Sequence, residues 1–484
     1  MDNEISKGVV IRSLIWKYLE RSSVQLIHFC ITIVLARLLM PSEYGIIALI
    51  MVFVNIFQVI VDGGFNTALI QKKNADNVDF STIFFFGLMM SALMYGILFF
   101  AAPLIASFYS QIELVPIIRV IGVVLFLHAI VAIQNSYVSR NMLFRKLFVC
   151  SLVSVLISGV VGIAMAYWGY GVWALVAQTI IAQLSLAIIM WFRLKWRPEM
   201  IFSYNRLKGM LDYGWKIFTT NIIVALFVNI RKLIIGRFYT PASLAYFERG
   251  EQFPNLIMTN INSSIQAVMF PTFAKVQKDR VKVKQILRRA TKMSCFIIYP
   301  LMVLLIVMAK PLILLLLTEK WLPAVAFMQI FCIANLFRPI TLANLEAIKA
   351  LGYSNISLKL EVIKKVVDVS ILIISVFFGV YAIAWGIVLF NFICVFINLA
   401  PNKKLLNYGI HEQIIDAAPT LLTSLVMGVS VYWIQLLTLP NIVILILQTV
   451  LGFIVYIGIS GIIKEESFMY ILQNLKEKGY IVNR

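Results

Sequence analysis

The chain has 484 residues, of which 61% are hydrophobic and only 13% charged, and its formal net charge is +20. An ordinary soluble domain is roughly half apolar and a quarter charged, so this composition excludes a soluble globular protein of this length. The positive charge does not indicate nucleic-acid binding, because Lys and Arg lie in short loops between apolar runs, where they contact anionic lipid headgroups. The composition therefore predicts an all-α, polytopic membrane protein.

Runs of about twenty apolar residues recur along the whole chain, which is the length that a helix needs to cross a bilayer. In chain order they predict about fourteen spanning helices: 12–38, 44–68, 80–106, 115–138, 147–168, 172–192, 211–236, 244–271, 288–309, 322–350, 358–378, 380–399, 413–434 and 441–463. A charged tail follows. The first ten residues are polar and precede no cleavage site, so we expect no cleaved signal peptide.

Basic residues are concentrated in loops on one side of the predicted helices. The rich segments are 72–73, 140–146, 193–208, 275–284 and 403–404. The turns at 168–171, 378–381 and 439–440 have no Lys or Arg at all. Because cytoplasmic loops carry the excess of positive charge, we expect a multi-pass membrane protein with both termini in the cytoplasm.

The chain also repeats itself with an offset close to two hundred residues. Four landmarks recur in order: 16–17 in 215–216, 36–41 in 236–241, 102–105 in 310–313 and 171–174 in 379–382. The repeat predicts two six-helix bundles, at 1–200 and 201–400, followed by an extra helix pair and cytoplasmic tail at 401–484. Bundles with the same orientation are typical of transporters built from parallel repeats, which enclose a central cavity near the midplane.

Charged residues inside the first predicted helix are the first candidates for substrate binding in that cavity. Lys17, Arg21 and His28 are spaced by four and seven residues, so they share one helix face. Lys17 can equally snorkel to the interface, with Glu20 as its partner. Arg21 lies about 13 Å inside at the helical rise, where snorkelling is harder, which favours a place in the cavity.

The second predicted helix carries Gln58 and Asp62, one turn apart and next to Gly63-Gly64. Two interpretations stay open, because polar side chains beside glycine can join two helices closely or can line a cavity. We assign Gln58 to substrate binding and Asp62 to coupling with a proton or a sodium ion. No other cofactor is expected.

The second half contributes further candidates for substrate binding: Lys216, Arg249, Asn260, Asn262 and Arg338. Arg249 can instead pair with Glu248 or Glu251 at the outer mouth. Pairs in the eleventh predicted helix, Glu361 with Lys365 and Lys364 with Asp368, are interpreted as structural. Cations in both halves favour a polyanionic substrate, because guanidinium groups match phosphate oxygens in pairs.

No motif indicates catalysis or a metal site. The five cysteines are far apart in apolar stretches, and no Cys/His spacing resembles a zinc site. The histidines His128 and His411 have no partner at a meaningful spacing. No outward loop exceeds about twenty residues, and no nucleophile constellation or phosphate-binding loop is present. We therefore expect a protein that is not an enzyme.

Three segments carry a resemblance to a known family: ARLLMPSEYG at 36–45, VDGGF at 61–65 and ALIQKK at 68–73. They resemble the bacterial polysaccharide transporters, the Wzx-type flippases of the multidrug/oligosaccharidyl-lipid/polysaccharide superfamily, similar in pattern to colanic acid and teichuronic acid exporters. The resemblance runs from about residue 8 to beyond 400. The related lipid II flippases have cavity arginines on helices one and eight, where Arg21 and Arg249 lie here.

The resemblance implies a flippase of the bacterial inner (plasma) membrane. It would move an undecaprenyl-diphosphate-linked oligosaccharide from the cytoplasmic to the outer leaflet by alternating access, coupled to an ion gradient. Its partners would be this substrate, membrane lipid and polysaccharide polymerase or assembly proteins, and not nucleic acid. The alternative is a cation-coupled multidrug or toxin extruder of the same superfamily, for which cavity arginines are unsuited. A scaffold of a glycan assembly complex would leave a charged interior without a purpose.

Overall fold

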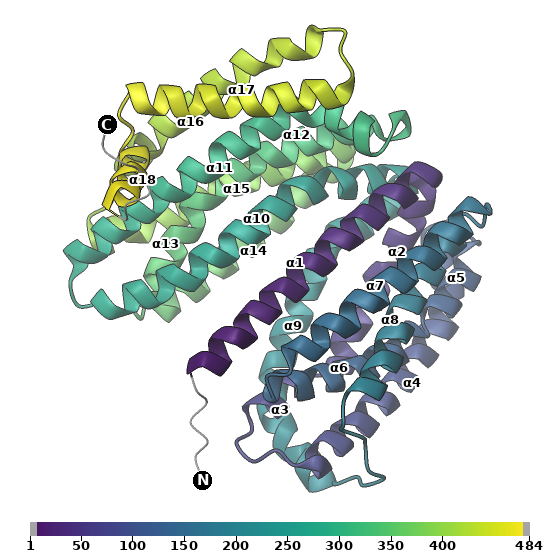
Figure 1. Ribbon diagram of the computed structural model, residues 1–484. Helices are drawn as coiled ribbons and strands as arrows, with labels where there is room; N and C mark the ends of the chain where they lie inside the picture. The colour runs from purple at the N-terminus through teal and green to yellow at the C-terminus, as the bar shows by residue number, and fades with distance from the viewer. Residues whose placement is uncertain (1–6, 478–484) are drawn as a thin grey trace. The chain divides into compact units, whose positions relative to one another are not determined.

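The structure is a computed structural model that describes residues 7–477 (Figure 1). Within this range the chain is helical apart from loops and short 3-10 turns. A helix satisfies its own backbone hydrogen bonds, which a spanning segment requires because lipid offers no partner. The chain divides into two compact units, Met1–Ala245 and Tyr246–Arg484, which we describe separately.

Over its described residues, the first unit holds nine helices, each of which follows a predicted apolar run or part of one. They are α1 (Lys7–Leu38), α2 (Pro41–Asp62), α3 (Phe65–Gln71), α4 (Asn77–Phe108), α5 (Leu114–Ile121), α6 (Val124–Arg140), α7 (Phe144–Tyr167), α8 (Val172–Arg193) and α9 (Tyr204–Phe238). In this unit α7 packs between α1 and α8, and α9 packs against α2, α3 and α4. The compact unit therefore includes α9 and extends beyond residue 200, where the sequence repeat begins again.

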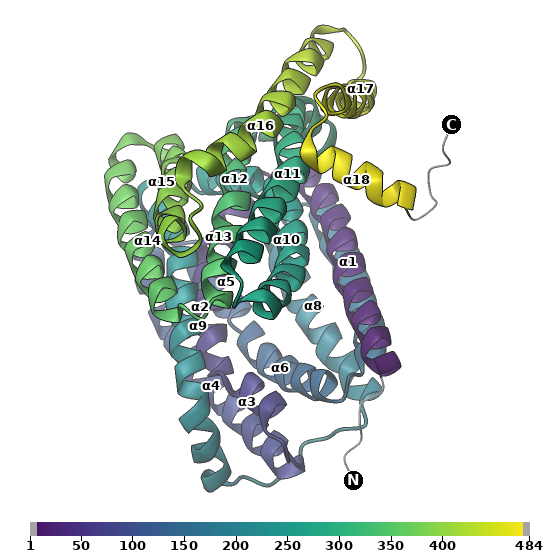
Figure 2. The same ribbon diagram turned by 90° about the vertical axis from the view of Figure 1, so that its left-hand side faces the viewer.

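The second unit begins within α10. Its helices are α10 (Pro241–Val276), α11 (Arg280–Leu316), α12 (Pro323–Leu336), α13 (Arg338–Ala350), α14 (Ser354–Ser375), α15 (Val380–Leu406), α16 (Ile410–Tyr432), α17 (Asn441–Ile462) and α18 (Glu466–Glu477). Here α11 is central, because it contacts α12, α13, α15, α16, α17 and α18. Figure 2 shows α18 turning away from the end of α17.

Each of the fourteen predicted helices has a counterpart, but three of them are divided in two. The run 44–68 becomes α2 and α3, because Gly63 and Gly64 adopt φ values of 53° and 75° that end one helix and start the next. The run 115–138 breaks at Gly122, and 322–350 breaks at Phe337, just before Pro339. A proline in a helix interior removes one hydrogen bond and clashes with the preceding turn.

Among the described residues, twelve helical segments are long and apolar enough to cross a membrane. Two predicted spans are not among these twelve segments: 244–271, which corresponds to α10, and 358–378, which corresponds to α14. Both runs are rich in polar side chains, so their place in a bilayer depends on protein packing around their charges. The chain is therefore an all-helical, multi-pass membrane protein.

Candidate functional site

The charged face of α1 is exposed in the first unit. Lys17, Arg21 and His28 all lie on the exposed surface of the helix. The opposite face packs on α7, where the rings of Trp16 and Phe148 have their centroids 5.6 Å apart. Arg21 and His28 therefore lie on the side of α1 away from this contact. The ammonium of Lys17 instead lies 5.8 Å from the centre of the Phe144 ring at the start of α7.

Two of these residues have local partners. Lys17 pairs with Glu20, with 2.9 Å between Nζ and Oε2, and the Lys17 side chain is 48% exposed. This is the partner expected for an interfacial lysine. His28 Nδ1 lies 3.4 Å from the hydroxyl of Thr32, one turn further along α1. Arg21 stands between them with its side chain exposed within a spanning segment.

Lys216 occupies the matching position on α9, which starts the second sequence repeat. Its side chain is exposed, as are Thr219 and Thr220 on the next turn. The hydroxyl of Thr220 donates to the Lys216 carbonyl at 2.9 Å. A side-chain hydroxyl bonded within its own helix leaves an oxygen that can still accept, so this face of α9 offers polar groups along a spanning helix.

A polar network surrounds Asp62 at the end of α2. The carboxylate Oδ1 of Asp62 lies 3.1 Å from His128 Nε2 on α6 and accepts a hydrogen bond of 3.0 Å from Asn66 Nδ2 on α3. The hydroxyl of Ser136 on α6 donates to Asn66 Oδ1 at 3.1 Å, which sets the orientation of the amide. Gln58 lies one turn before Asp62 and is half-buried.

The contact between His128 and Asp62 gives this histidine a partner that lies at no meaningful spacing in the sequence. The two residues are 66 positions apart, so no local spacing indicates the pair. A carboxylate only accepts hydrogen bonds, so either His128 Nε2 carries a proton or Asp62 is protonated and donates to it. Side-chain exposures of 22% for His128 and 33% for Asp62 allow water to reach the pair.

In the second unit, Arg249 on α10 is half-buried among polar and aromatic groups. It donates to Gln252 Oε1 at 2.6 Å, and its guanidinium lies 5.7 Å from the centre of the Trp321 ring. Glu251, one of the acids considered as its partner, accepts a hydrogen bond from Asn255 at 3.0 Å. Contact with tryptophan uses the face of a guanidinium, whereas an anion binds at its edge, so the two contacts are compatible.

Three further predicted residues, Asn260, Asn262 and Arg338, belong to the second unit. Asn260 is exposed and donates to the carbonyl of Leu256 at 2.8 Å, and Arg338 is exposed at the start of α13. Asn262 is half-buried, and its buried Oδ1 has no hydrogen-bond partner among the described residues. An amide oxygen of this kind can accept a hydrogen bond from a hydroxyl. Substrate binding by these residues stays a prediction.

Lys364 on α14 pairs with Glu361 at 2.5 Å, three residues earlier on the same helix. The sequence predicts a pair between Lys364 and Asp368, four residues later. The structure shows an ion pair with Glu361, on the preceding turn. Lys364 is 8% exposed. A buried ammonium needs a partner, so this pair accounts for its charge in structural terms.

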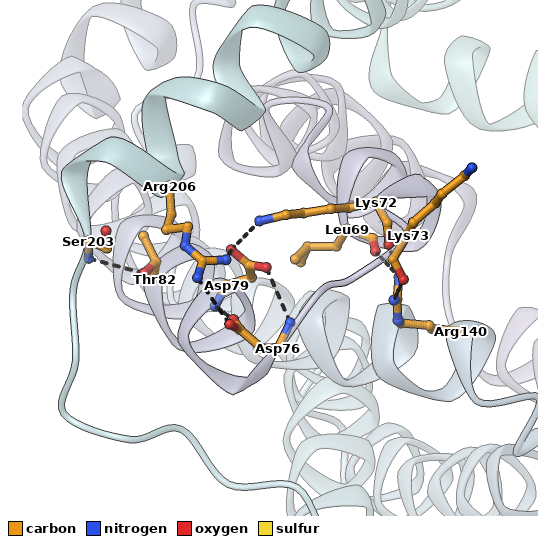
Figure 3. Close-up of polar contacts among 9 residues, drawn as sticks. All are labelled: Leu69, Lys72, Lys73, Asp76, Asp79, Thr82, Arg140, Ser203 and Arg206. Carbon is orange, nitrogen blue, oxygen red and sulfur yellow. Dashed lines mark hydrogen bonds and ion pairs between the residues drawn. The ribbon is translucent and has the colours of Figure 1, made fainter. Parts of the chain in front are cut away.

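A cluster of charged residues lies at the loop between α3 and α4 (Figure 3). In the sequence these residues indicate only how the chain is oriented in the membrane. Asp79 on α4 has no exposed side-chain surface, and its Oδ1 lies 2.6 Å from Lys72 Nζ and 3.1 Å from an Arg206 nitrogen. Arg206 also pairs with Asp76 at 3.1 Å. The cluster therefore ties the beginning of α9 to the α3–α4 loop.

Asp76 also acts as the N-cap residue of α4. Its carboxylate accepts a hydrogen bond of 3.0 Å from the Asp79 backbone N–H, and this bond, aided by the charges of Arg206 and Lys72, lowers the pKa of Asp76. Asp79 in turn accepts from the Asp76 backbone N–H at 3.2 Å. Such reciprocal bonds satisfy backbone donors that would otherwise lack partners at the start of a helix.

Arg140 at the end of α6 closes the other end of this loop (Figure 3). Its guanidinium donates to the carbonyls of Leu69 at 2.9 Å, Lys72 at 2.5 Å and Lys73 at 2.7 Å. These carbonyls lie at and beyond the end of α3, where the helix itself provides no donor. Arg140 is therefore a structural residue. The structural role of Arg140 could not be predicted from the pattern of loop charges, because that pattern does not indicate which backbone carbonyls lie near the guanidinium.

The helices and their apolar length define an all-helical, multi-pass membrane protein. The lipid II flippase MurJ in its inward closed conformation has the same fold, with a TM-score of 0.74 over 93% of this chain and 99% of that chain, at 16% identity. Among the described residues no group of three or more His, Cys, Asp or Glu could hold a metal ion.

The chain belongs to the polysaccharide biosynthesis protein family, whose model matches residues 34–326. This confirms the resemblance seen at 36–73. The chain is 28% identical over 304 residues to the teichuronic acid biosynthesis protein TuaB of Bacillus subtilis (strain 168), covering 62% of each chain. It is 24% identical over 322 residues to the succinoglycan biosynthesis transport protein ExoT of Rhizobium meliloti (strain 1021), covering 66% of this chain and 65% of that one. The matches span less than two thirds of either relative.

Proposed function

We propose that the protein is a flippase and not an enzyme, and that it moves an undecaprenyl-diphosphate-linked oligosaccharide from the cytoplasmic to the outer leaflet of the bacterial inner membrane. Three observations support the proposal: membership of a polysaccharide biosynthesis family, a relative named as a transport protein, and a fold shared with a lipid II flippase. Alternation of basic and neutral loops supports a cytoplasmic position for both termini.

Exposed cations within spanning helices are the observation on which the substrate class depends. Arg21 is exposed on α1 and Lys216 on α9, both within segments long and apolar enough to cross a membrane. A charge at the bilayer centre costs on the order of 3 kcal/mol by insertion scales, so it needs a compensating partner. A diphosphate supplies one, because its oxygens accept paired guanidinium hydrogen bonds.

The substrate's parts suit different residues. Lys17, Arg21 and Lys216 attract the diphosphate from the cytoplasmic side, and Arg249 and Arg338 bind it later in the cycle. The groups that meet sugar hydroxyls are the amides of Gln58, Asn260 and Asn262 and the ring of His28. The prenyl tail stays in the lipid, so the cycle needs no covalent chemistry. An extruder of organic cations would be opposed by the same arginines.

The test is complementation of a strain lacking the gene. We expect the deletion to accumulate a lipid-linked oligosaccharide on the cytoplasmic leaflet, and Arg21→Ala to fail to rescue it while its amount in the membrane is unchanged. Arg21→Lys separates charge from geometry, because lysine lacks the planar fork.

The matched control is Arg12→Ala, which removes an exposed cation from the same helix before the span begins. It should rescue fully. Full rescue by Arg21→Ala contradicts the site. Purified protein that releases an organic cation under an ion gradient, and does not respond to a lipid diphosphate, contradicts the function.

For the coupling ion we propose a proton, carried by Asp62 and His128. Asn66 and His128 both contact the same carboxylate oxygen, at 3.0 and 3.1 Å, which leaves one exchangeable proton between an acid and a base. In proteoliposomes we expect a pH gradient, without sodium, to drive transport. Asp62→Asn and His128→Gln should each reduce that transport at least about tenfold, whereas Asp212→Asn, an exposed acid on α9, should not. Transport driven only by sodium would overturn the proton assignment.

A further inference from the structure

A basic pocket lies in the second unit where α11, the turn after α17 and α18 meet. Its volume is about 340 Å³, and it is lined by Arg289, Lys292, Lys464, Glu466, Ser467 and Tyr470, with Met293, Met469 and Gln473. None of these residues takes part in the proposed transport site. All belong to the region that the sequence repeat does not include, apart from the start of α11.

The charges of the pocket do not cancel. Lys292 is held between two acids, at 3.0 Å from Asp416 and 2.6 Å from Glu466. Arg289 and Lys464 are exposed, and no carboxylate among the described side chains forms an ion pair with either of them. The pocket therefore keeps two cations that are available to an external anion.

Arg289 is oriented for such a contact. Its guanidinium carbon lies 3.8 Å from the centre of the Tyr470 ring, which places the group over the aromatic face. Stacking uses the faces of the guanidinium and leaves the N–H groups at its edge able to bind oxygen atoms in pairs. The arrangement suits a phosphate group better than a carboxyl-bearing side chain of another protein, because one phosphate can meet Arg289 and Lys464 together.

The surroundings of Lys464 indicate where that phosphate comes from. Lys464 lies just after α17 in the left-handed conformation, at φ 53°. The two residues before it, Ile462 and Ile463, are 82% and 57% exposed. At the end of a spanning helix, exposed isoleucines contact acyl chains, and a lysine next to them lies at the level of the headgroups.

Helix α18 completes this interfacial arrangement. It is anchored on the unit by Phe468 and Ile471, which pack against the cluster around Val303 and Tyr456. Its first turn is capped by Glu465, which accepts from the Phe468 N–H at 2.9 Å. A short helix held at the ends of two spanning helices, with a basic pocket beside it, is typical of a segment at the membrane surface.

We propose that this pocket binds the phosphodiester headgroup of an anionic phospholipid in the leaflet next to α18, with Arg289 and Lys464 as its ligands and the acyl chains along Ile462 and Ile463. The site is separate from the transport site, and its existence does not depend on the proposed substrate. Bound lipid holds the α17–α18 turn against α11, since a ligand that binds only the folded state stabilises it.

The experiment measures lipid adducts on the purified full chain by native mass spectrometry, with phosphatidylglycerol as the probe and phosphatidylcholine as the neutral reference. We expect tighter binding of phosphatidylglycerol, and a rise in the melting temperature that phosphatidylcholine does not cause. The double variant Arg289→Gln/Lys464→Gln should weaken phosphatidylglycerol binding at least about tenfold and abolish the rise, while melting as the unaltered protein does in neutral detergent.

Two controls separate the alternatives. Lys278→Gln/Lys404→Gln removes two exposed cations elsewhere in the same unit and should bind phosphatidylglycerol normally. Unchanged binding by the Arg289/Lys464 variant, or an equal loss in both double variants, overturns the site. Undecaprenyl diphosphate is the third probe. If the Arg289→Gln/Lys464→Gln variant loses undecaprenyl diphosphate binding and keeps phosphatidylglycerol binding, the pocket belongs to the substrate and the phospholipid proposal is contradicted. Weaker phosphatidylglycerol binding with intact transport supports the lipid site and leaves the proposed function standing.

Discussion

Asp79 is a buried acid whose charge is balanced by two cations from different parts of the chain. Its side chain has no exposed surface, whereas Lys72 and Arg206 are 33% and 40% exposed. Removing the acid from such a cluster leaves two cations beside each other without their shared partner. The cluster therefore stabilises the α3–α4 loop and the beginning of α9 as one piece.

We expect Asp79→Asn to lower the free energy of unfolding by about 1–3 kcal/mol, less than for a fully buried pair because both cations reach solvent. Thermal unfolding of the purified protein in detergent measures the change. Glu113→Gln, which neutralises an exposed acid before α5, is the control and should have little effect. Equal melting temperatures for Asp79→Asn and the unaltered protein would show that the cluster does not stabilise the fold.

Of the Asp62–His128 pair, only one member could be recognised as a candidate from the sequence. Asp62 stands out in the sequence because an acid in an apolar run is costly. His128 does not, because one neutral histidine in a helix is ordinary and its partner is distant. Only the packing of α2 against α6 brings the two together.

Among the helices, the break between α2 and α3 allows α9 to come close. Gly64 has φ 75°, and a Cβ placed on it would lie 2.5 Å from the Gly214 carbonyl oxygen of α9. A side chain here meets both backbone strain and backbone contact. The Gly-Gly pair is therefore a site of close helix packing, one of the two interpretations open from the sequence.

We expect Gly64→Ala to destabilise the protein by about 2 kcal/mol or more, because neither backbone can yield without moving α9. Gly96→Ala is the matched control: nothing lies within 4 Å of a methyl group added at this position on α4, so the substitution should leave stability unchanged or raise it by about 0.5–1 kcal/mol. Melting temperatures in detergent compare the two. A similar effect of both substitutions would contradict the close approach of α9.

Helices α10 and α14 show that composition alone does not decide whether a predicted span crosses the membrane. Both occupy predicted spans, yet neither is apolar enough by composition. Their charges are partly matched inside the protein, as with Lys364 and Glu361 on α14. Polarity in a helix of this kind reports its surroundings in the fold, because only protein or water can solvate it.

The orientation of the entire chain in the membrane is the prediction that most directly tests the charge pattern. Lys195→Cys and Lys278→Cys, in two basic loops, should react with a membrane-impermeant maleimide only from the cytoplasmic side, because positive loops stay there. Tyr170→Cys, in a neutral turn, should react only from outside. Cys30 is exposed in the structure, so Cys30→Ser removes the background first. Labelling of all three positions from one side would refute the proposed topology.

The class of molecule, the order of its helical runs and its family could all be predicted from the sequence. Spanning helices need long apolar stretches, and an apolar stretch is a local property of consecutive residues. The repeat landmarks near residues 36 and 236 are local in the same sense. The place of Arg21 on one helix face with Lys17 and His28 also followed from helical spacing, and the structure shows the Arg21 side chain exposed.

Contacts between distant segments became visible only in the folded chain. Packing brings His128 within hydrogen-bonding distance of Asp62 and lets Arg140 donate to a carbonyl at the end of α3. It also places α9 in the first compact unit. Each of these depends on which helix faces meet, and side-chain packing across tens of residues leaves no periodic trace in the chain. The basic pocket could not be predicted for the same reason, because its two exposed cations, Arg289 and Lys464, lie 175 positions apart in the sequence.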